Sequence, residues 1–204
     1  MKRLWLHPFP LRAWHWLNTA LVLLLIITGI QLRAPEVEIF SGYRTAVVVH
    51  KATGFVMVAS FLFWLAYSLV TKRARKQYVI RLSDIAGLAK QGKYYAFGVF
   101  RGWENPFRAT TEAKFNPLQK ISYISIQFIF TPIIAVTGLC FGNILFFKGA
   151  IKSIGGIRVL DASHVVVAYV FVAYLFVHVY MATVGRTPLA HTKAMFTGYE
   201  EEAD

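Results

Sequence analysis

The sequence predicts an all-α membrane protein built as a bundle of four transmembrane helices. Its 204 residues are 56% hydrophobic and only 16% charged, whereas about a quarter of the residues in a soluble domain are charged. Four long stretches contain no Asp, Glu, Lys or Arg, and each is long enough to span a bilayer, which takes roughly 20 apolar residues. These stretches are 13–32, 52–71, 121–147 and 162–185. The single cysteine, Cys140, excludes a disulfide framework and an all-cysteine iron–sulfur cluster.

The first two spans are expected at about 13–34 and 43–71. The first is too long for the apolar region of a cleavable signal, and no small-residue cleavage site follows it. The second carries one cation near its start, Lys51, whose ammonium group is expected to snorkel to the interface. Three tryptophans fit an aromatic belt at the first membrane entry: Trp5, Trp14 and Trp16.

The last two spans are expected at about 117–147 and 160–185. Asn116 followed by Pro117 predicts the start of the third span, because it places a capping side chain before a proline at the first helical position. No strong internal repeat is visible. The pairs Thr28-Gly29 and Thr137-Gly138 lie at similar depths in the first and third spans, which is a weak sign of symmetry.

The connection between the second and third spans is long, basic and rich in Gly and Tyr. Within it, Ser83-Asp84 has the character of a helix start leading into 85–90. One interpretation is a short surface helix in the membrane interface. The other is a solvated loop.

The distribution of Lys and Arg predicts the orientation. Sixteen of these residues flank the inner ends of the spans or lie in the long loop, against six on the other side. Because cytoplasmic segments carry the excess of Lys and Arg, both termini and the long loop are expected in the cytoplasm. The net charge of +12 is therefore interpreted as a topology signal, not as a nucleic-acid surface. We expect one integral membrane domain over 1–204.

Four of the six histidines lie within or at the ends of the spans: His15, His50, His164 and His178. Ionisable residues in membrane helices are costly and usually functional. His15 and His178 are placed near the inner face, and His50 and His164 near the outer face. His164 and His178 are 14 residues apart, which is roughly 21 Å along one helix and only about 40° off the same face. The two remaining histidines, His7 and His191, are expected at the surface or interface.

Imidazole is a good axial ligand for haem iron, so the depths predict two haems with paired histidine ligands. The pairs are His15 with His178, near the cytoplasm, and His50 with His164, near the outside. Glycines at 29, 54 and 138 would give a porphyrin room, or they reflect ordinary close helix packing. Cations that could meet haem propionates, or could instead be topology signals, are Arg12 and Lys120 on the inner side and Arg44, Lys51 and Arg158 on the outer side.

Other interpretations of the histidines are weaker. Interhelical hydrogen bonds alone would be an expensive use of four intramembrane imidazoles. A tight metal site needs ligands a few residues apart. A proton relay normally adds intramembrane carboxylates, and Asp161 lies at a span end.

The chain resembles the four-helix di-haem cytochrome b subunits of formate dehydrogenase (gamma subunit), nickel–iron hydrogenase and thiosulfate reductase, a cytochrome b561-like group. The resemblance covers nearly the whole chain. The residues that carry the resemblance are His-Pro-Phe-Pro-Leu-Arg-Ala-Trp-His-Trp at 7–16, Val-His-Lys-Ala-Thr-Gly at 49–54, Lys-Phe-Asn-Pro-Leu-Gln-Lys at 114–120, His164 with His178, and the tail 185–199.

The resemblance implies two haem b groups with the same histidine pairs, and a quinone or menaquinone site near the inner haem at Asn116. Asn116 as a simple helix cap is the alternative. It also implies a respiratory electron-transfer subunit in a prokaryotic inner membrane, with no substrate chemistry beyond that of quinone. The implied partner is an iron–sulfur or multihaem redox subunit on the periplasmic side. The alternatives are a stand-alone cytochrome b561-type quinone oxidoreductase and a haem-free transporter or assembly factor.

Overall fold

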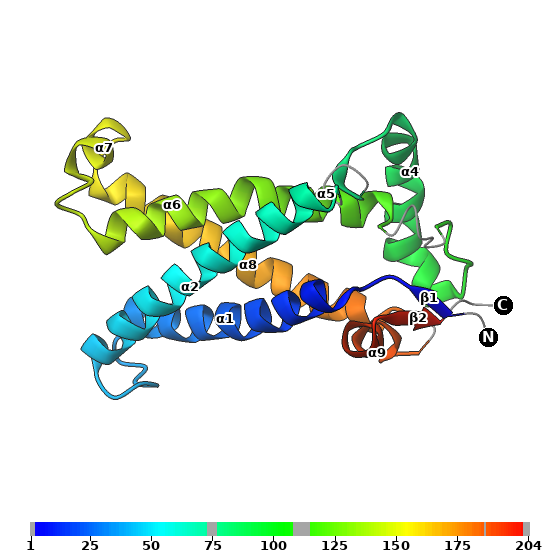
Figure 1. Cartoon of the computed structure of the whole chain (residues 1–204), viewed down its shortest axis with the longest axis horizontal. Coiled ribbons are helices and arrows are strands. Elements are labelled where there is room, and N and C mark those ends of the chain that lie inside the picture. Colours follow the sequence, from blue (N-terminus) through cyan, green and yellow to red (C-terminus); the bar gives the residue numbers. More distant parts are fainter. Residues whose placement is uncertain (1–2, 73–76, 108–114, 186, 202–204) are drawn as a thin grey trace. The chain divides into compact units, whose positions relative to one another are not determined.

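The computed structural model describes residues 3–72, 77–107, 115–185 and 187–201, and it is mostly helical (Figure 1). The elements in chain order are β1 (Arg3–Trp5), α1 (Phe9–Arg33), α2 (Tyr43–Val70), α4 (Leu82–Lys93), the π-helix η1 (Tyr94–Gly98), the 3₁₀ helix η2 (Val99–Arg101), α5 (Pro117–Ser125), the π-helix η3 (Ile126–Phe130), α6 (Thr131–Gly142), α7 (Lys148–Ser153), α8 (Ile157–Thr183), α9 (Ala190–Thr197) and β2 (Tyr199–Glu201).

Four helices are long and apolar enough to cross a membrane, as predicted. They are Phe9–Arg33, Tyr43–Val70, Pro117–Gly142 and Ile157–Thr183. The predicted end of the third span at 147 is wrong. Asn143 leaves the helix with φ −147° and ψ 79°, and its side-chain oxygen accepts from the backbone N–H of Phe146 at 3.1 Å. The apolar run continues past this turn, so a prediction from hydropathy alone placed the end of the helix too late in the sequence.

The other helix starts also follow local chemistry. The first helix begins at Phe9, where the carbonyl of Pro8 accepts from the N–H groups of Leu11 and Arg12. The fourth begins at Ile157, directly after Gly155 and Gly156, whose φ angles of 104° and 90° suit glycine. Both helices start before the predicted positions. The predictions relied on stretches without charged residues, and Arg12 and Arg158 lie inside the first turns of these helices.

The third span is not a uniform α-helix. A π-helical turn, η3, separates α5 from α6. Pro132 stands at the second position of α6, and a proline ring there clashes with the carbonyl four residues earlier while removing one N–H donor. A π turn is a common local adjustment to such a disturbance.

The short helix expected after Ser83-Asp84 is confirmed as α4. It begins one residue earlier, at Leu82. Asp84 is responsible for this start, because its Oδ2 accepts the backbone N–H of Arg81 at 2.7 Å. Such a carboxylate satisfies a donor that the first helical turn leaves open.

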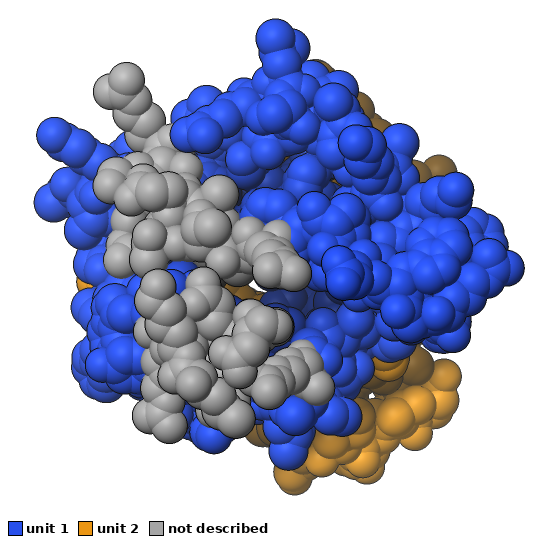
Figure 2. Space-filling model, turned by 90° about the vertical axis from the view of Figure 1, so that its right-hand side faces the viewer, with its two compact units in different colours: residues 1–12, 65–128, 177–204 blue, residues 13–64, 129–176 orange. Residues whose placement is uncertain are grey.

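The chain divides into two compact units (Figure 2). Unit 2 comprises residues 13–64 and 129–176, and unit 1 comprises the rest. In unit 2, Asn18 Nδ2 donates to Ser60 Oγ at 2.7 Å and joins α1 to α2. The ammonium of Lys51 donates to the carbonyl of Gly142 at 3.2 Å, which joins α2 to the C-terminal end of α6. These contacts hold parts of the spanning helices together within one unit.

Unit 1 contains a feature that the sequence did not predict, a pair of three-residue strands. β1 and β2 are antiparallel, with Trp5 opposite Tyr199. Gly198, with φ 89°, lets the chain turn from α9 into β2. A Cβ at Gly198 would lie 2.6 Å from Trp5 Cζ3, so the turn requires glycine.

Candidate functional site

The structure brings His50 of α2 and His164 of α8 together in unit 2. Their ring centroids are 6.4 Å apart and the ring planes make an angle of 68°. Both side chains are half-buried. The sequence predicted this pair from depth alone, with no information on which helices are neighbours.

The His50 ring is held by a hydrogen bond to Thr28 of α1. The Thr28 hydroxyl donates to the carbonyl of Leu24 at 2.7 Å. Because a hydroxyl has a single proton, its lone pair must receive the contact from His50 Nδ1, 2.8 Å away. Nδ1 therefore carries the ring proton, and Nε2 is left as the nitrogen with a free lone pair.

His164 is held in the same way by Thr137 of α6. The Thr137 hydroxyl donates to the carbonyl of Ile133 at 2.8 Å, and His164 Nδ1 lies 2.8 Å from the same oxygen. Thr28 is fully buried and Thr137 nearly so. Two imidazoles are thus fixed in the same tautomer by two threonines that each bond back to their own helix, a common arrangement of threonine in helices.

A glycine follows each of these threonines. A Cβ built on Gly29 would lie 3.6 Å from His50 Cε1, and one on Gly138 would lie 3.5 Å from His164 Cε1. Cε1 is the ring carbon between the two nitrogens. The weak symmetry of Thr28-Gly29 and Thr137-Gly138 is therefore a repeated contact in the structure.

The residues fit the two axial positions of one haem. Metal–imidazole bonds are about 2 Å long, so two imidazoles on one iron have ring centres roughly 6 to 6.5 Å apart. The observed 6.4 Å agrees with this separation. Each ring also has the second-shell hydrogen bond that metal-ligating histidines usually make through their other nitrogen.

The other two predicted ligands lie on spanning helices, as expected. His15 is in α1, with its ring 5.1 Å from that of Trp16, and His178 is in the second half of α8. Both are half-buried. His15 belongs to unit 2 and His178 to unit 1, so their pairing stays a prediction.

The predicted cations have different surroundings. Arg12 donates to the carbonyl of Phe196, and its guanidinium carbon lies 5.7 Å from the Phe9 ring centre. The buried Nε of Arg12 has no hydrogen-bond partner within the described part of the chain. Arg158 and Arg44 are exposed near the starts of α8 and α2.

Lys120 forms an ion pair with Asp84. Its Nζ lies 2.7 Å from Asp84 Oδ2, and both side chains are close to fully buried. Burial alone would raise the pKa of Asp84, but hydrogen bonds from Lys120 and from the Arg81 backbone outweigh it and lower the pKa. The pair ties α4 to α5.

Asn116 caps α5, as predicted. Its side-chain oxygen accepts from the Gln119 N–H at 2.9 Å, and its amide nitrogen donates to the hydroxyl of Tyr95 at 2.7 Å. Burial raises the pKa of Tyr95, so this hydroxyl stays protonated at neutral pH. Asn116 itself is 2% exposed.

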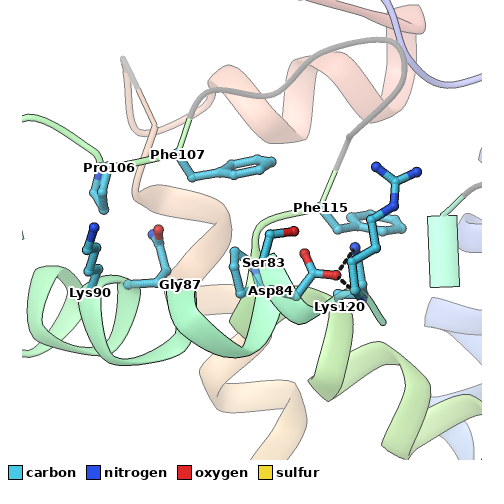
Figure 3. A pocket seen from close by; sticks show the side chains of 11 residues that line it. Ser83, Asp84, Gly87, Lys90, Pro106, Phe107, Phe115 and Lys120 are labelled. Carbon is cyan, nitrogen blue, oxygen red and sulfur yellow. Dashed lines mark hydrogen bonds and ion pairs between the residues drawn. The ribbon is translucent and has the colours of Figure 1, made fainter. Parts of the chain in front are cut away.

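A pocket of about 300 Å³ lies beside this helix start. Figure 3 shows the Asp84–Lys120 pair at the pocket, with the rings of Phe107 and Phe115 nearby. Phe115 and Pro117, the neighbours of Asn116, both line it. The pocket therefore combines aromatic surface with a buried ion pair.

His191 belongs to neither histidine pair. Its Nδ1 lies 3.2 Å from Glu200 Oε1. The hydrogen bond and charge of Glu200 raise the pKa of His191, against the effect of burial. His7 precedes α1, and its backbone N–H donates to the Gly198 carbonyl.

The known proteins whose sequences match this chain agree with a helical membrane protein that has paired histidines. The family model for prokaryotic cytochrome b561 matches residues 6–198. The chain is 31% identical over 200 residues to the Escherichia coli protein named "Putative cytochrome YdhU", with 97% of this chain and 75% of the relative covered.

The family is one of membrane cytochromes b that bind haem b and transfer electrons, which agrees with four apolar helices and with the half-buried, hydrogen-bonded His50 and His164. The resemblance seen in the sequence is thereby confirmed. The chain belongs to the prokaryotic cytochrome b561 family and is a multi-pass integral protein of the inner membrane.

Proposed function

We propose that this chain is a di-haem cytochrome b subunit that moves electrons across the membrane between a redox partner on the outer side and the quinone pool. The observation that carries the proposal is the His50–His164 pair, with ring centres 6.4 Å apart and both Nδ1 atoms already bonded. Such a pair suits a six-coordinate haem, which has no open position for a substrate and is suited to electron transfer.

His50 and His164 would hold one haem b, and His15 and His178 the second. Haem b supplies one-electron exchange when bound at these positions. The protein's own contribution at His50 and His164 is to hold the rings in fixed orientations with unprotonated Nε2 atoms. Arg158 and Arg44 are the cations proposed for outer propionates, and Arg12 and Lys120 for inner ones. The unpaired Nε of Arg12 supports its assignment.

We place quinone or menaquinone on the inner side, near the start of α5. The support is the pocket of about 300 Å³ between Phe107, Phe115 and the Asp84–Lys120 pair, next to Asn116. Aromatic rings suit a flat apolar headgroup, and buried polar groups suit its two oxygens. Asn116 has a structural role as a cap in addition to this proposed one.

The partner is proposed on the outer side, where the His50–His164 pair is placed by the positive-inside rule. An iron–sulfur or multihaem subunit docked there would exchange electrons at this pair. The short outer segments 34–42 and 143–156 give little room for a small-molecule donor site within the chain itself. This favours a complex over a stand-alone oxidoreductase.

The first experiment is a dithionite-minus-oxidised visible spectrum of the purified chain with haem quantified per polypeptide. Two b-type haems are expected in the wild type and one in H50A, because that variant lacks one axial ligand. H7Q is the control and should retain both haems. One haem in the wild type, or two in H50A, would contradict the ligand scheme.

The partner is tested by mild solubilisation and co-purification. A stable complex with a redox subunit that loses electron flow to quinone in H50A supports the proposal. A chain that purifies alone and reduces quinone from a small donor would establish the stand-alone oxidoreductase instead.

A further inference from the structure

We propose that Thr28 and Thr137 are positioning residues that set the reduction potential of the outer haem through its two ligands. This inference rests on the His50–His164 ligation proposed above. It adds a role for two residues that touch neither the iron nor a redox partner. Their hydroxyl oxygens accept the Nδ1–H of His50 and of His164, each at 2.8 Å.

Each hydroxyl lies within reach of two backbone carbonyls, those of Leu24 and Leu25 for Thr28 and those of Ile133 and Ile134 for Thr137, and a carbonyl can only accept the hydroxyl proton. Thr28 donates to Leu24 and Thr137 donates to Ile133, in both cases to the carbonyl four residues earlier. The carbonyl oxygens fix the hydroxyl protons, so a lone pair must face each imidazole. Both hydroxyls are buried, and water does not compete for the contact.

The consequence for an iron ligand follows from the charge on the ring. A hydrogen bond accepted from Nδ1–H makes the imidazole a stronger electron donor at Nε2. A stronger donor stabilises ferric over ferrous iron and lowers the midpoint potential, and second-shell hydrogen bonding is one of the ways in which a protein tunes haem. His50 and His164 would hold the same iron, so both hydrogen bonds would act on its potential.

The glycine after each threonine lies at the same edge of its histidine ring. With the Thr28 and Thr137 hydroxyls bonded to the rings, the next residue in each helix faces ring carbon Cε1 at 3.6 and 3.5 Å from its built Cβ. Glycine keeps this edge of each ring, beside Nε2, free of side-chain atoms. A Cβ at either position would make an ordinary van der Waals contact with the ring, and only a longer side chain would reach further along its edge.

The test is a redox titration of the purified holo-protein carrying T28V or T137V. Valine keeps the shape of threonine and removes the acceptor, so the midpoint potential of one haem should rise while the other haem stays unchanged. T28S and T137S keep the hydroxyl and should titrate as the wild type does. T71V is the matched control, because the Thr71 hydroxyl also donates to the carbonyl four residues earlier, that of Tyr67, at 2.6 Å, but Thr71 lies directly after the end of α2, far along the chain from His50.

Each result has a defined meaning. A raised potential, or loss of one haem in T28V with retention in T28S, supports the inference. Potentials equal to those of the wild type in both valine variants overturn it, and so does a serine variant that behaves like its valine counterpart. If T28V and T137V shift two different haems, the inferred shared iron is wrong. Absence of haem from the folded wild type would overturn the proposed function itself.

Discussion

A neutral imidazole inside a membrane has one nitrogen that donates a hydrogen bond and one that accepts. The groups around the ring determine which nitrogen carries the proton. Thr28 and Thr137 place the proton on Nδ1 of His50 and of His164. His191 has a different kind of partner, the carboxylate of Glu200. A threonine leaves a ring neutral, whereas a carboxylate favours the charged form.

The charged form of His191 makes the tail sensitive to pH. Because the folded-state pKa is raised, the contact with Glu200 contributes fully below the unfolded histidine pKa of about 6.5. Its contribution is lost as pH rises through the folded-state pKa. Cleavage of the tail by protease in inside-out vesicles should therefore become faster as the pH rises above about 6.5.

The E200Q variant provides the control for this pH effect. It should be cleaved at a rate that changes much less over the same pH range, once the protease's own pH dependence is subtracted. A wild-type tail that becomes more resistant as pH rises would contradict the assignment.

At this scale the sequence showed which residues carry chemistry but not how they are held. The histidine positions were readable because uncharged spans make any imidazole conspicuous. The threonines were missed, since threonine is ordinary in membrane helices and its partner lies 22 or 27 residues away. The repeated Thr-Gly pair was the available signal, and its meaning needed the interhelical geometry.

At the scale of elements, the start of the third span depends on one side chain. N116A should lower the free energy of unfolding by about 1 kcal/mol, because the Gln119 N–H loses its acceptor. The change can be followed by thermal unfolding in detergent with far-UV circular dichroism. N116D keeps a capping oxygen, and its carboxylate can accept from the Tyr95 hydroxyl, so it should retain the cap although burial of the charge lowers its stability somewhat.

The same pair of variants separates the two roles of Asn116. If the residue also contacts quinone, N116D should impair quinone reduction in a protein that is still folded with the α5 cap in place. If the kinetics of quinone reduction are unchanged in N116D, capping of α5 is the one role that remains for Asn116.

The Asp84–Lys120 pair, which joins α4 to α5, should contribute more to stability than an exposed ion pair does, because both side chains are nearly buried. D84N leaves the buried ammonium of Lys120 without its carboxylate, a change that typically costs on the order of 3 kcal/mol. The double variant D84L/K120M should recover much of this loss, because neither charge is then left alone. Thermal unfolding of the two variants provides the comparison.

A second ion pair serves as the control for D84N. Arg33 and Asp161 lie 3.2 Å apart, but their side chains are 57% and 44% exposed. Exposed pairs contribute at most about 1 kcal/mol, so D161N should change stability little. A D161N effect as large as that of D84N would show that burial is not the cause.

Element ends were the least predictable part of the fold. Apolar runs located all four spans, because bilayer thickness sets their length. The ends were set by local chemistry instead: by Asn143 after α6, by the glycine pair before α8 and by Asp84 at α4. The strands β1 and β2 have three residues each, too few for any alternating pattern to be seen.

For the whole molecule, the excess of Lys and Arg predicts both termini and the segment between α2 and α5 on the cytoplasmic side. The single buried Cys140 makes this testable. On a C140A background, E36C and K148C should react with a membrane-impermeant thiol reagent in intact spheroplasts. K90C should react only after lysis, and the reverse pattern would invert the topology and the side on which the partner docks.

The threonine–histidine contacts also bear on how the protein is made. Each joins two helices that are consecutive among the spans, α1 with α2 and α6 with α8. A helical hairpin can enter the membrane as one step, so each ligand ring can be oriented as soon as its own hairpin has inserted. The cofactor would then meet two ligand rings that are already oriented, so haem insertion would not have to wait for the histidine side chains to be ordered.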